Sequence, residues 1–441
     1  MRIGKKIFFL GGIFFVGLIA IGYGAGYLTF KGISEKAPAN ISAAQPETDP
    51  YRAFLVEVFD KVKTNYWEKT TDEQLANLYK LATAKVAQKD ATELTLTTTD
   101  LAGVQKLIAE QIKDLADDKK KEFITGVTDV VLANLKPFGR SRLYSAKQEK
   151  ELRDTVSNVD TSTDLYAALG VGKDASEKNI TTAYQTQGEK LQADKSPEAV
   201  QKLALVQRAY EALAKPENKK QYDQTKVEPT VIYRFITPDI FYMHLTKFSP
   251  QSFDELQAVA NSVKTSPTTL IFDLRGNVGG AIDILQYFLG PFIGPDQYAY
   301  EFFHQDEKTP FKTKVGWLES LVRYKKVVIL TDGQMQSSAE VMAATLKKYN
   351  VGVLVGTTTK GWGTVEQLIP MEKQLSPDEK YTLLLVHSLT LREDGQPIEG
   401  KGVEGKGVDP TINITDKNWP KELLAHFNYP ELITAVKNLI K

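Results

Sequence analysis

Residues 270–280, which read LIFDLRGNVGG, decide the fold of the larger part of this chain. The first half is an apolar run that predicts a buried β-strand. The second half contains Gly276, Gly279 and Gly280, and glycines after a strand let the backbone approach a ligand closely. The next residues, AIDILQYFL, predict a helix. A buried strand that turns through glycines into a helix is typical of an α/β core.

The same alternation continues on both sides of this stretch. Strands are predicted at DIFYMHLT and KKVVILTDG, and a helix at SSAEVMAATLKKY leads into the strand VGVLVG. A long strand, YTLLLVHSLTLRED, and a closing helix, ELLAHFNYPELITAVKNLI, come later. Strand, helix and strand in quick succession predict parallel pairs. We therefore predict an α/β core with a mixed sheet and a C-terminal helix over residues 229–441.

The segment before this core is predicted to be helical over residues 51–160. Phe54, Val58 and Val62 recur at helical spacing, and the stretch TTDEQLANLYKLATAKVA begins with residues that favour helix capping. The simplest interpretation of such helices is a structural bundle that packs on itself and separates other domains, without chemistry of its own.

The amino terminus predicts a membrane anchor over residues 1–30. Residues 7–30 contain no charged side chain, and about twenty apolar residues span a bilayer. Arg2, Lys5 and Lys6 predict a cytoplasmic N-terminus for this single-pass segment of the cell membrane, with the globular part outside the cytoplasm. A cleaved signal peptide is the alternative, but the stretch is long for one and no A-x-A site closes it. Residues 31–50 are a polar linker.

Composition excludes several function classes. The chain has 55 Lys and Arg and 55 Asp and Glu, so its net charge is zero. This charge balance does not indicate nucleic-acid binding. It has no cysteine, which excludes thiolate nucleophiles and Cys-based zinc sites. None of its four histidines pairs with another at ligand spacing, and no G-x-S-x-G motif is present for a Ser-His-Asp triad. We expect no metal and no cofactor.

Residues 161–228 resemble a J-domain over its full length. The resemblance rests on LYAALGV, DASEKNITTAY and VQRAYEALAKPENKKQYD, and it implies an all-α domain. J-domains engage Hsp70 through His-Pro-Asp between their two long helices, whereas this chain reads Gln192-Ala193-Asp194 there. The preceding helix is also nearly neutral where the family is basic. We therefore expect the fold to be retained and Hsp70 not to be a partner.

Two serines mark the candidate chemistry of the core. Ser337 and Ser338 stand at the predicted start of a helix, where a serine is usually an N-cap. A serine at a helix N-terminus is also well placed as a nucleophile, because the free amides stabilise a developing oxyanion. The glycine stretch does not fit a dinucleotide site, because it lacks the G-x-G-x-x-G pattern. It fits an oxyanion loop, in which Gly279 or Gly280 donates an amide.

Residues from about 230 to 415 resemble the C-terminal processing, or tail-specific, serine protease family. LIFDLRGNVGG is similar to its oxyanion loop, SSAEVMAATL to its nucleophile helix, and REDGQPIEGKGVEGKGVDP to its closing motif. Upstream, VFDKVKTNYWEKTTDEQL and LKPFGRSRLYSAKQEKELRD are similar to its N-terminal helical segments. The resemblance implies that Ser337 is the nucleophile and that the amides of Ser338 and of Gly279 or Gly280 form the oxyanion hole.

The chain departs from that family at two places. The family usually carries a PDZ domain where this chain has its J-like unit. The family also uses a Ser/Lys dyad, with the lysine 25 residues after the nucleophile, and that position is Trp362 here. An indole N–H only donates and cannot accept the serine proton. Lys360, two residues earlier, is the candidate replacement base, and Glu366 stands where the family has a supporting glutamine. A carboxylate beside Lys360 would oppose that role by keeping it protonated.

Two functions remain open from the sequence. The first is an extracytoplasmic serine endopeptidase that acts on unfolded or C-terminal segments of polypeptides, with Ser337 as nucleophile and Lys360 as base. The second is an inactive peptide-binding or scaffold protein that retains the protease fold, with Trp362 as an apolar contact. The effect of Trp362→Lys separates two versions of the site: it restores hydrolysis if the base is missing, and does little or harms activity if Lys360 already serves.

Overall fold

The computed structural model describes residues 49–160, 163–194, 196–392, 394–400 and 405–440. The predicted anchor at residues 7–30 lies outside these ranges. Within the described part of the chain, no helix is both long and apolar enough to cross a membrane.

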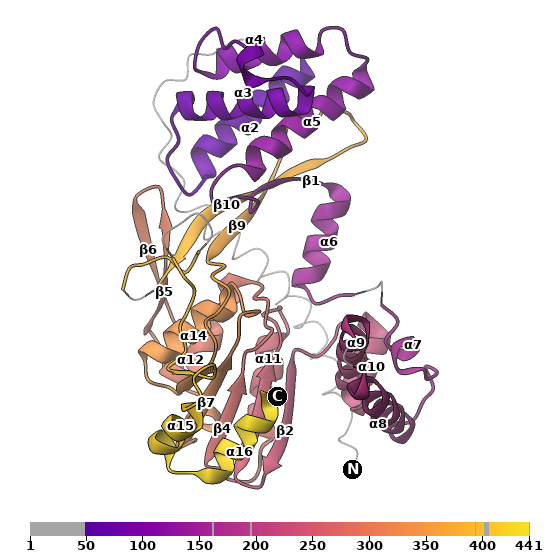
Figure 1. The fold of residues 1–441 in the computed structure, drawn as a ribbon, viewed down its shortest axis with the longest axis vertical. Coiled ribbons are helices and arrows are strands. Elements are labelled where there is room, and N and C mark those ends of the chain that lie inside the picture. Colours follow the sequence, from indigo (N-terminus) through magenta and orange to yellow (C-terminus); the bar gives the residue numbers. More distant parts are fainter. Residues whose placement is uncertain (1–48, 161–162, 195, 393, 401–404, 441) are drawn as a thin grey trace, which may run out of the picture. The chain divides into compact units, whose positions relative to one another are not determined.

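A six-stranded mixed sheet forms the centre of the α/β core (Figure 1). Its order is β11-β8-β7-β4-β3-β2, and every neighbouring pair is parallel except β2 with β3. The strands are β2 (Val231–Thr237), β3 (Ile240–Leu245), β4 (Thr269–Asp273), β7 (Lys326–Thr331), β8 (Val353–Gly356) and β11 (Ile412–Asn413). The predicted mixed α/β core is confirmed, and residues 270–280 supply its buried strand β4 and the turn that follows.

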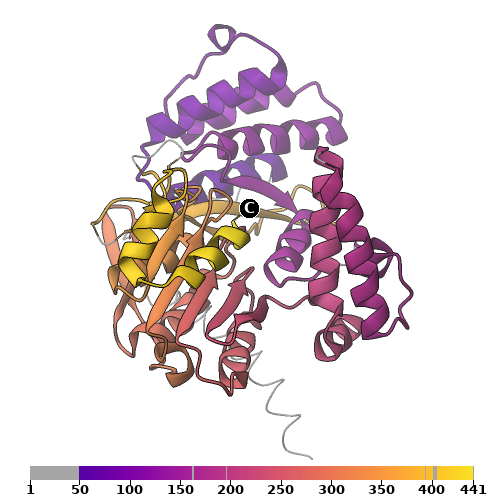
Figure 2. The ribbon, with the colours of Figure 1, turned by 60° about the horizontal axis from the view of Figure 1, so that its bottom comes forward.

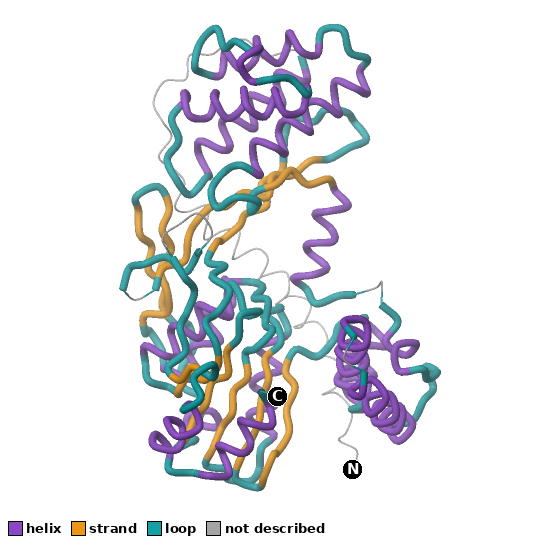
Figure 3. Tube along the Cα trace, in the orientation of Figure 1, coloured by secondary structure: helices purple, strands orange, loops and turns teal. Residues whose placement is uncertain are grey.

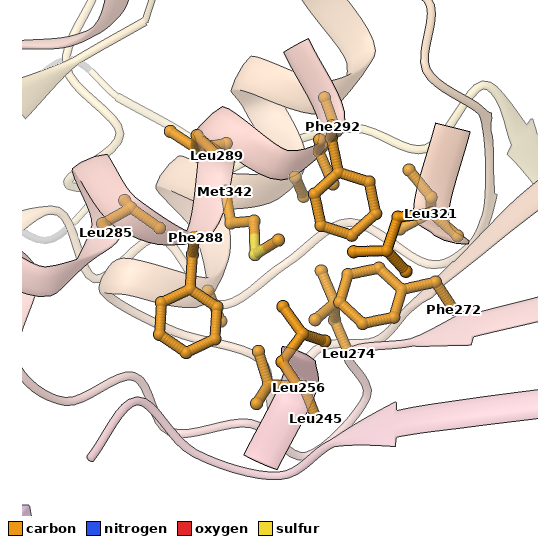
Figure 4. Packing of buried hydrophobic residues seen from close by; sticks show 14 of the residues in the cluster. Leu245, Leu256, Phe272, Leu274, Leu285, Phe288, Leu289, Phe292, Leu321 and Met342 are labelled. Carbon is orange, nitrogen blue, oxygen red and sulfur yellow. The ribbon is translucent and has the colours of Figure 1, made fainter. Parts of the chain in front are cut away.

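Helices cover both faces of this sheet, because alternate side chains of each strand point to opposite faces. Phe272 of β4 packs on one face with three helices, and Figure 4 shows part of that cluster. These helices are α11 (Ser252–Ser262), α12 (Leu285–Ile293) and α14 (Ser338–Lys348). Ile271 packs on the other face with α15 (Trp419–Phe427) and α16 (Pro430–Leu439). The prediction of one closing helix is wrong, because Asn428 adopts φ 48° and Pro430 begins a new helix.

A second sheet joins the core to the N-terminal region. Its path is β1-β10-β5-β6, and β9 also pairs with β10. The strands are β1 (Arg142–Ser145), β5 (Tyr298–His304), β6 (Glu307–Lys312), β9 (Thr364–Pro370) and β10 (Tyr381–Leu391). Because β1 lies within residues 51–160, the prediction of a wholly helical segment there needs this correction. Its four residues are held in a strand by antiparallel pairing with β10, a partner that the local sequence does not reveal.

The remainder of the N-terminal region is helical, as predicted (Figure 3). It consists of α2 (Pro50–Asn65), α3 (Asp72–Ala87), α4 (Leu101–Ile112), α5 (Asp117–Ala133) and α6 (Ala146–Val156). Phe54, Val58 and Val62 are buried in one apolar cluster that also includes Leu383 and Leu385 of β10. The helices therefore share a core with the second sheet, and do not form a separate bundle.

The J-like unit is helical (Figure 2). Its four helices pack around a small apolar core. They are α7 (Leu165–Leu169), α8 (Glu177–Ala193), α9 (Pro197–Leu213) and α10 (Pro216–Thr225). Gln192 and Ala193 end α8 and Asp194 is its C-cap, which places the altered tripeptide between the two long helices. The segments that enter and leave the unit pair through Val159 and Val227.

The core packing gives a stability prediction for α12. Phe288 is fully buried, with its ring 5.0 Å from that of Phe248 and 5.5 Å from that of Phe253. Phe288→Ala should lower the free energy of unfolding by about 3–5 kcal/mol, because it leaves a cavity. Its neighbour Tyr287 is 42% exposed, so Tyr287→Ala should cost about 1 kcal/mol or less. Urea unfolding of both variants measures the difference, and equal losses would contradict this packing.

Candidate active site

Ser337 is the N-cap of α14 and adopts φ 57° and ψ −130°. A positive φ is uncommon for a residue with a side chain, and persists only where surrounding contacts enforce it. Those contacts are hydrogen bonds from Ser337 N to the carbonyl of Trp362 (2.9 Å) and to Oε2 of Glu340 (3.0 Å). The backbone of the candidate nucleophile is thus fixed by the loop that carries the candidate base.

The glycine loop lies directly against Ser337. A Cβ atom on Gly279, which has φ 83°, would come within 2.6 Å of Ser337 Cβ. A Cβ atom on Gly280 would come within 2.0 Å of the Phe248 carbonyl oxygen. Ser338 Oγ donates to the Gly280 carbonyl at 3.1 Å. The structure therefore brings the two serines and the two predicted glycines together, and explains why side chains are excluded at both glycine positions.

The backbone amides of this cluster differ in availability. Gly279 N donates to Asn277 Oδ1 at 2.8 Å, so this amide is occupied. Within the described residues, the amides of Ser338 and Gly280 donate no hydrogen bond. Of the two predicted glycine donors, Gly280 is therefore the one with a free N–H.

Lys360 lies beside the candidate nucleophile without touching its hydroxyl. Its side chain is exposed, and its Nζ donates to Oε1 of Gln336 at 2.6 Å. Gln336 directly precedes Ser337. The backbone N–H of Gln336 donates to the backbone carbonyl of Asn277 at 3.0 Å. Among the described residues, no hydrogen bond joins Ser337 Oγ to Lys360 or to any other basic group. Lys360 Nζ is thus held one residue away from the hydroxyl.

The indole of Trp362 has a hydrogen-bond acceptor at its Nε1 and a cation over its ring. Its Nε1 donates to Glu366 Oε1 at 3.3 Å, and the guanidinium of Arg140 lies over its ring, with Cζ 3.3 Å from the centroid. Glu366 also accepts from Thr364 Oγ1 at 2.5 Å, and burial raises the pKa of its carboxyl. Glu366 therefore supports the indole of Trp362, and does not orient Lys360.

Glu340 organises this loop, although no role was predicted for it from the sequence. Its fully buried carboxylate accepts from the amides of Gly361 (2.8 Å), Trp362 (2.8 Å) and Ser337 (3.0 Å), and from Thr359 Oγ1. Burial raises the pKa of this carboxyl as well. The signal that could have revealed it is a glutamate three residues after the N-cap, the spacing of a capping box.

Comparison with known proteins divides the chain into two matched segments. Residues 239–414 match the model of peptidase family S41, and residues 164–223 match that of the DnaJ domain. The carboxy-terminal-processing protease of Bartonella bacilliformis is 27% identical over 178 residues, 39% of this chain and 39% of the relative. Carboxy-terminal processing protease CtpB of Bacillus subtilis is 28% identical over 184 residues, 40% of this chain and 34% of the relative.

The second segment and the fold have relatives of their own. DnaJ-related protein SCJ1 of Saccharomyces cerevisiae is 48% identical over 64 residues, 14% of this chain and 17% of the relative. Among solved structures, the photosystem II D1 C-terminal processing protease has a TM-score of 0.46 at 12% identity, over 83% of this chain and 94% of that one. The chain spans about two fifths or less of the curated relatives that it matches.

These matches confirm the resemblance predicted from the sequence. Residues 239–414 are similar to peptidase family S41 and residues 164–223 to the DnaJ domain, which are the two resemblances that the sequence motifs indicated.

The hydrogen bonds of Glu340 give a stability prediction. In Glu340→Gln, the new amide group faces backbone N–H donors, so at least one of them loses its acceptor. We expect the free energy of unfolding to fall by about 1–3 kcal/mol. Glu366→Gln is the control, because its amide oxygen can still accept from Trp362 Nε1. Urea unfolding at neutral pH measures both, and an unchanged Glu340→Gln would show that the carboxylate does not hold the loop.

The raised pKa of Glu366 gives a pH dependence. Ionising this buried carboxyl costs stability, so the cost is absent below its ordinary pKa of 4.5 and complete once the pH exceeds the raised value. The stability of Glu366→Gln relative to wild type should therefore increase as the pH rises above 4.5, the ordinary pKa of the carboxyl. Glu372→Gln, at an exposed position, serves as the control. A difference that stays constant with pH would contradict the burial argument.

Proposed function

We propose that this chain is a serine endopeptidase of the C-terminal processing type, in which Ser337 attacks the substrate and Lys360 accepts the serine proton. The observation that carries the proposal is the 2.6 Å hydrogen bond from Lys360 Nζ to Gln336, the residue directly before Ser337. A long, exposed lysine side chain at that point needs only to exchange Gln336 for the neighbouring hydroxyl. The family's usual base position is occupied by Trp362, so no other lysine is offered by the loop.

The proposed reaction is acyl transfer through an ester on Ser337. As Ser337 Oγ attacks the peptide carbonyl, Lys360 takes its proton and passes it to the leaving amine, and water then hydrolyses the ester. The tetrahedral oxyanion would be stabilised by the free amides of Ser338 and Gly280, at the start of α14. The positive φ of Ser337 supports this role, because strained backbone is concentrated at functional sites.

We further propose that the substrates are unfolded or C-terminal segments of proteins outside the cytoplasm, and that residues 7–30 anchor the enzyme in the cell membrane. The support is the uncharged composition of residues 7–30 with basic residues before them. The names of the two protease relatives support carboxy-terminal processing as the activity. Hsp70 is not included as a partner, because the J-like unit has Gln192 and Ala193, at the end of α8, where J-domains have the His-Pro of their Hsp70-binding motif.

Substitution of the proposed dyad tests the activity. Cleavage of a fluorogenic unfolded protein should be lost in Ser337→Ala and should fall about 10²- to 10⁴-fold in Lys360→Met, which removes the base but keeps the length of the side chain. Lys373→Met, an exposed lysine outside the site, is the matched control. Equal rates in wild type and Ser337→Ala would end the enzymatic proposal.

Trp362→Lys tests whether Lys360 already serves as the base. The new ammonium group would lie beside the Arg140 guanidinium, which now contacts the indole. We therefore expect no gain in cleavage, and a loss through like-charge crowding, with or without Glu366→Gln. If instead cleavage rises by about 10²-fold or more, the base was missing and Lys360 is not the working group.

A second candidate function is peptide binding without cleavage. The specific observation in its favour is that Trp362 is held by Arg140 and Glu366 in a compact arrangement in which Lys360 does not contact Ser337 Oγ. In this case labelled unfolded polypeptide binds the protein and is not cut, and Ser337→Ala binds equally well. Polypeptide that is neither bound nor cut would exclude both functions.

A further inference from the structure

Arg140 belongs to the N-terminal region, between α5 and β1, yet its side chain lies in the candidate active site. Its guanidinium Cζ is 3.3 Å from the centroid of the Trp362 ring. This contact is close, and a cation over the face of an indole is the most favourable form of the cation–π interaction. The side chain of Arg140 is only 9% exposed, so water weakens the contact little.

A second contact ties Arg140 to the other side of the same loop. Its Nη2 donates to both carboxylate oxygens of Glu399, at 3.1 and 3.4 Å. Glu399 is fully buried and also accepts from the amide of Gly363 at 3.1 Å. Arg140 therefore holds the ring of Trp362 directly, and holds the next residue through Glu399.

The held loop in turn supports Ser337. The Trp362 carbonyl accepts from Ser337 N, and the Trp362 amide donates to Glu340, whose carboxylate also accepts from Ser337 N. A shift of Trp362 would therefore move both acceptors of the Ser337 amide and the neighbouring Lys360. Lys360 Nζ also lies near this ring, 5.2 Å from its centroid, but Arg140 is closer, at 3.3 Å.

We propose that Arg140 is a positioning residue for the peptidase reaction: by stacking on Trp362 and pairing with Glu399, it holds residues 359–363 in the register that aligns Ser337 and Lys360. This inference rests on the proposed function. It also makes the N-terminal region part of the active site, because the α/β core alone lacks this cation. The aromatic ring at the family's base position is then the surface by which Arg140 holds the loop.

Arg140→Lys is the main test, because it keeps the charge beside Glu399 and loses the planar group that stacks on the indole. Arg142→Lys is the matched control: it lies two residues away, pairs with Asp129 at 2.8 Å and does not contact Trp362. Acrylamide quenching of Trp362 emission, taken as the difference from Trp362→Phe, reports the position of the ring without requiring turnover. Cleavage of the fluorogenic unfolded protein reports kcat and KM.

We expect Arg140→Lys to raise the quenching of Trp362 about twofold or more and to lower kcat about 10- to 100-fold with little change in KM, whereas Arg142→Lys changes neither. Trp362→Leu, which keeps the Arg140–Glu399 pair, should reproduce the loss in kcat if Arg140→Lys fails to fold. Unchanged quenching, or increased quenching with wild-type kcat, would overturn the proposal. If the wild type shows no turnover, the proposed function fails, while quenching still decides whether Arg140 holds the ring.

Discussion

The structure around Ser337 depends on one buried carboxylate. Glu340 has no exposed surface, and its two oxygens accept from Ser337, Thr359, Gly361 and Trp362. A buried carboxylate is costly unless its oxygens are satisfied, so these four donors must stay in place together. In this way one side chain on the first turn of α14 joins Ser337, the candidate nucleophile, to the loop that carries Lys360 and Trp362. The strained φ of Ser337 is maintained by the same set of contacts.

The indole of Trp362 requires partners that an ammonium group at the same position would not require. Its N–H needs an acceptor, and Glu366 supplies a carboxylate oxygen. Its face attracts a cation, and Arg140 supplies one. Arg140 in turn is balanced by the fully buried Glu399. Each of these side chains therefore supplies a hydrogen-bond or charge partner for the next one. A single substitution among them leaves one polar group without its partner.

The sequence predicted the core better than it predicted the site. Strands such as β4 and helices such as α14 follow from local apolar patterns. Ser337 and Ser338 were placed by the predicted helix start and Gly279 and Gly280 by the glycine turn after β4, and the structure brings these four residues together. The strand β1 was missed because only its pairing with β10 makes it a strand. Arg140 and Glu399 were missed because they are 259 residues apart, and no spacing rule connects them. The availability of an amide, which separates Gly280 from Gly279, depends on the Asn277 side chain and is visible only in three dimensions.

The J-like unit contacts the segments that enter and leave it. Arg208 of α9 bonds to Asp160, in the segment that enters the unit, and to Glu228, in the segment that leaves it. Lys215 lies over the ring of Tyr233 in β2, 3.2 Å from its centroid. A PDZ domain captures a peptide by adding it to a sheet edge, and four helices offer no such edge. Strand β2, in contrast, is the terminal strand of the six-stranded sheet and follows the unit directly. The contacts of Arg208 and Lys215 therefore join the J-like unit to the segment that begins this edge strand.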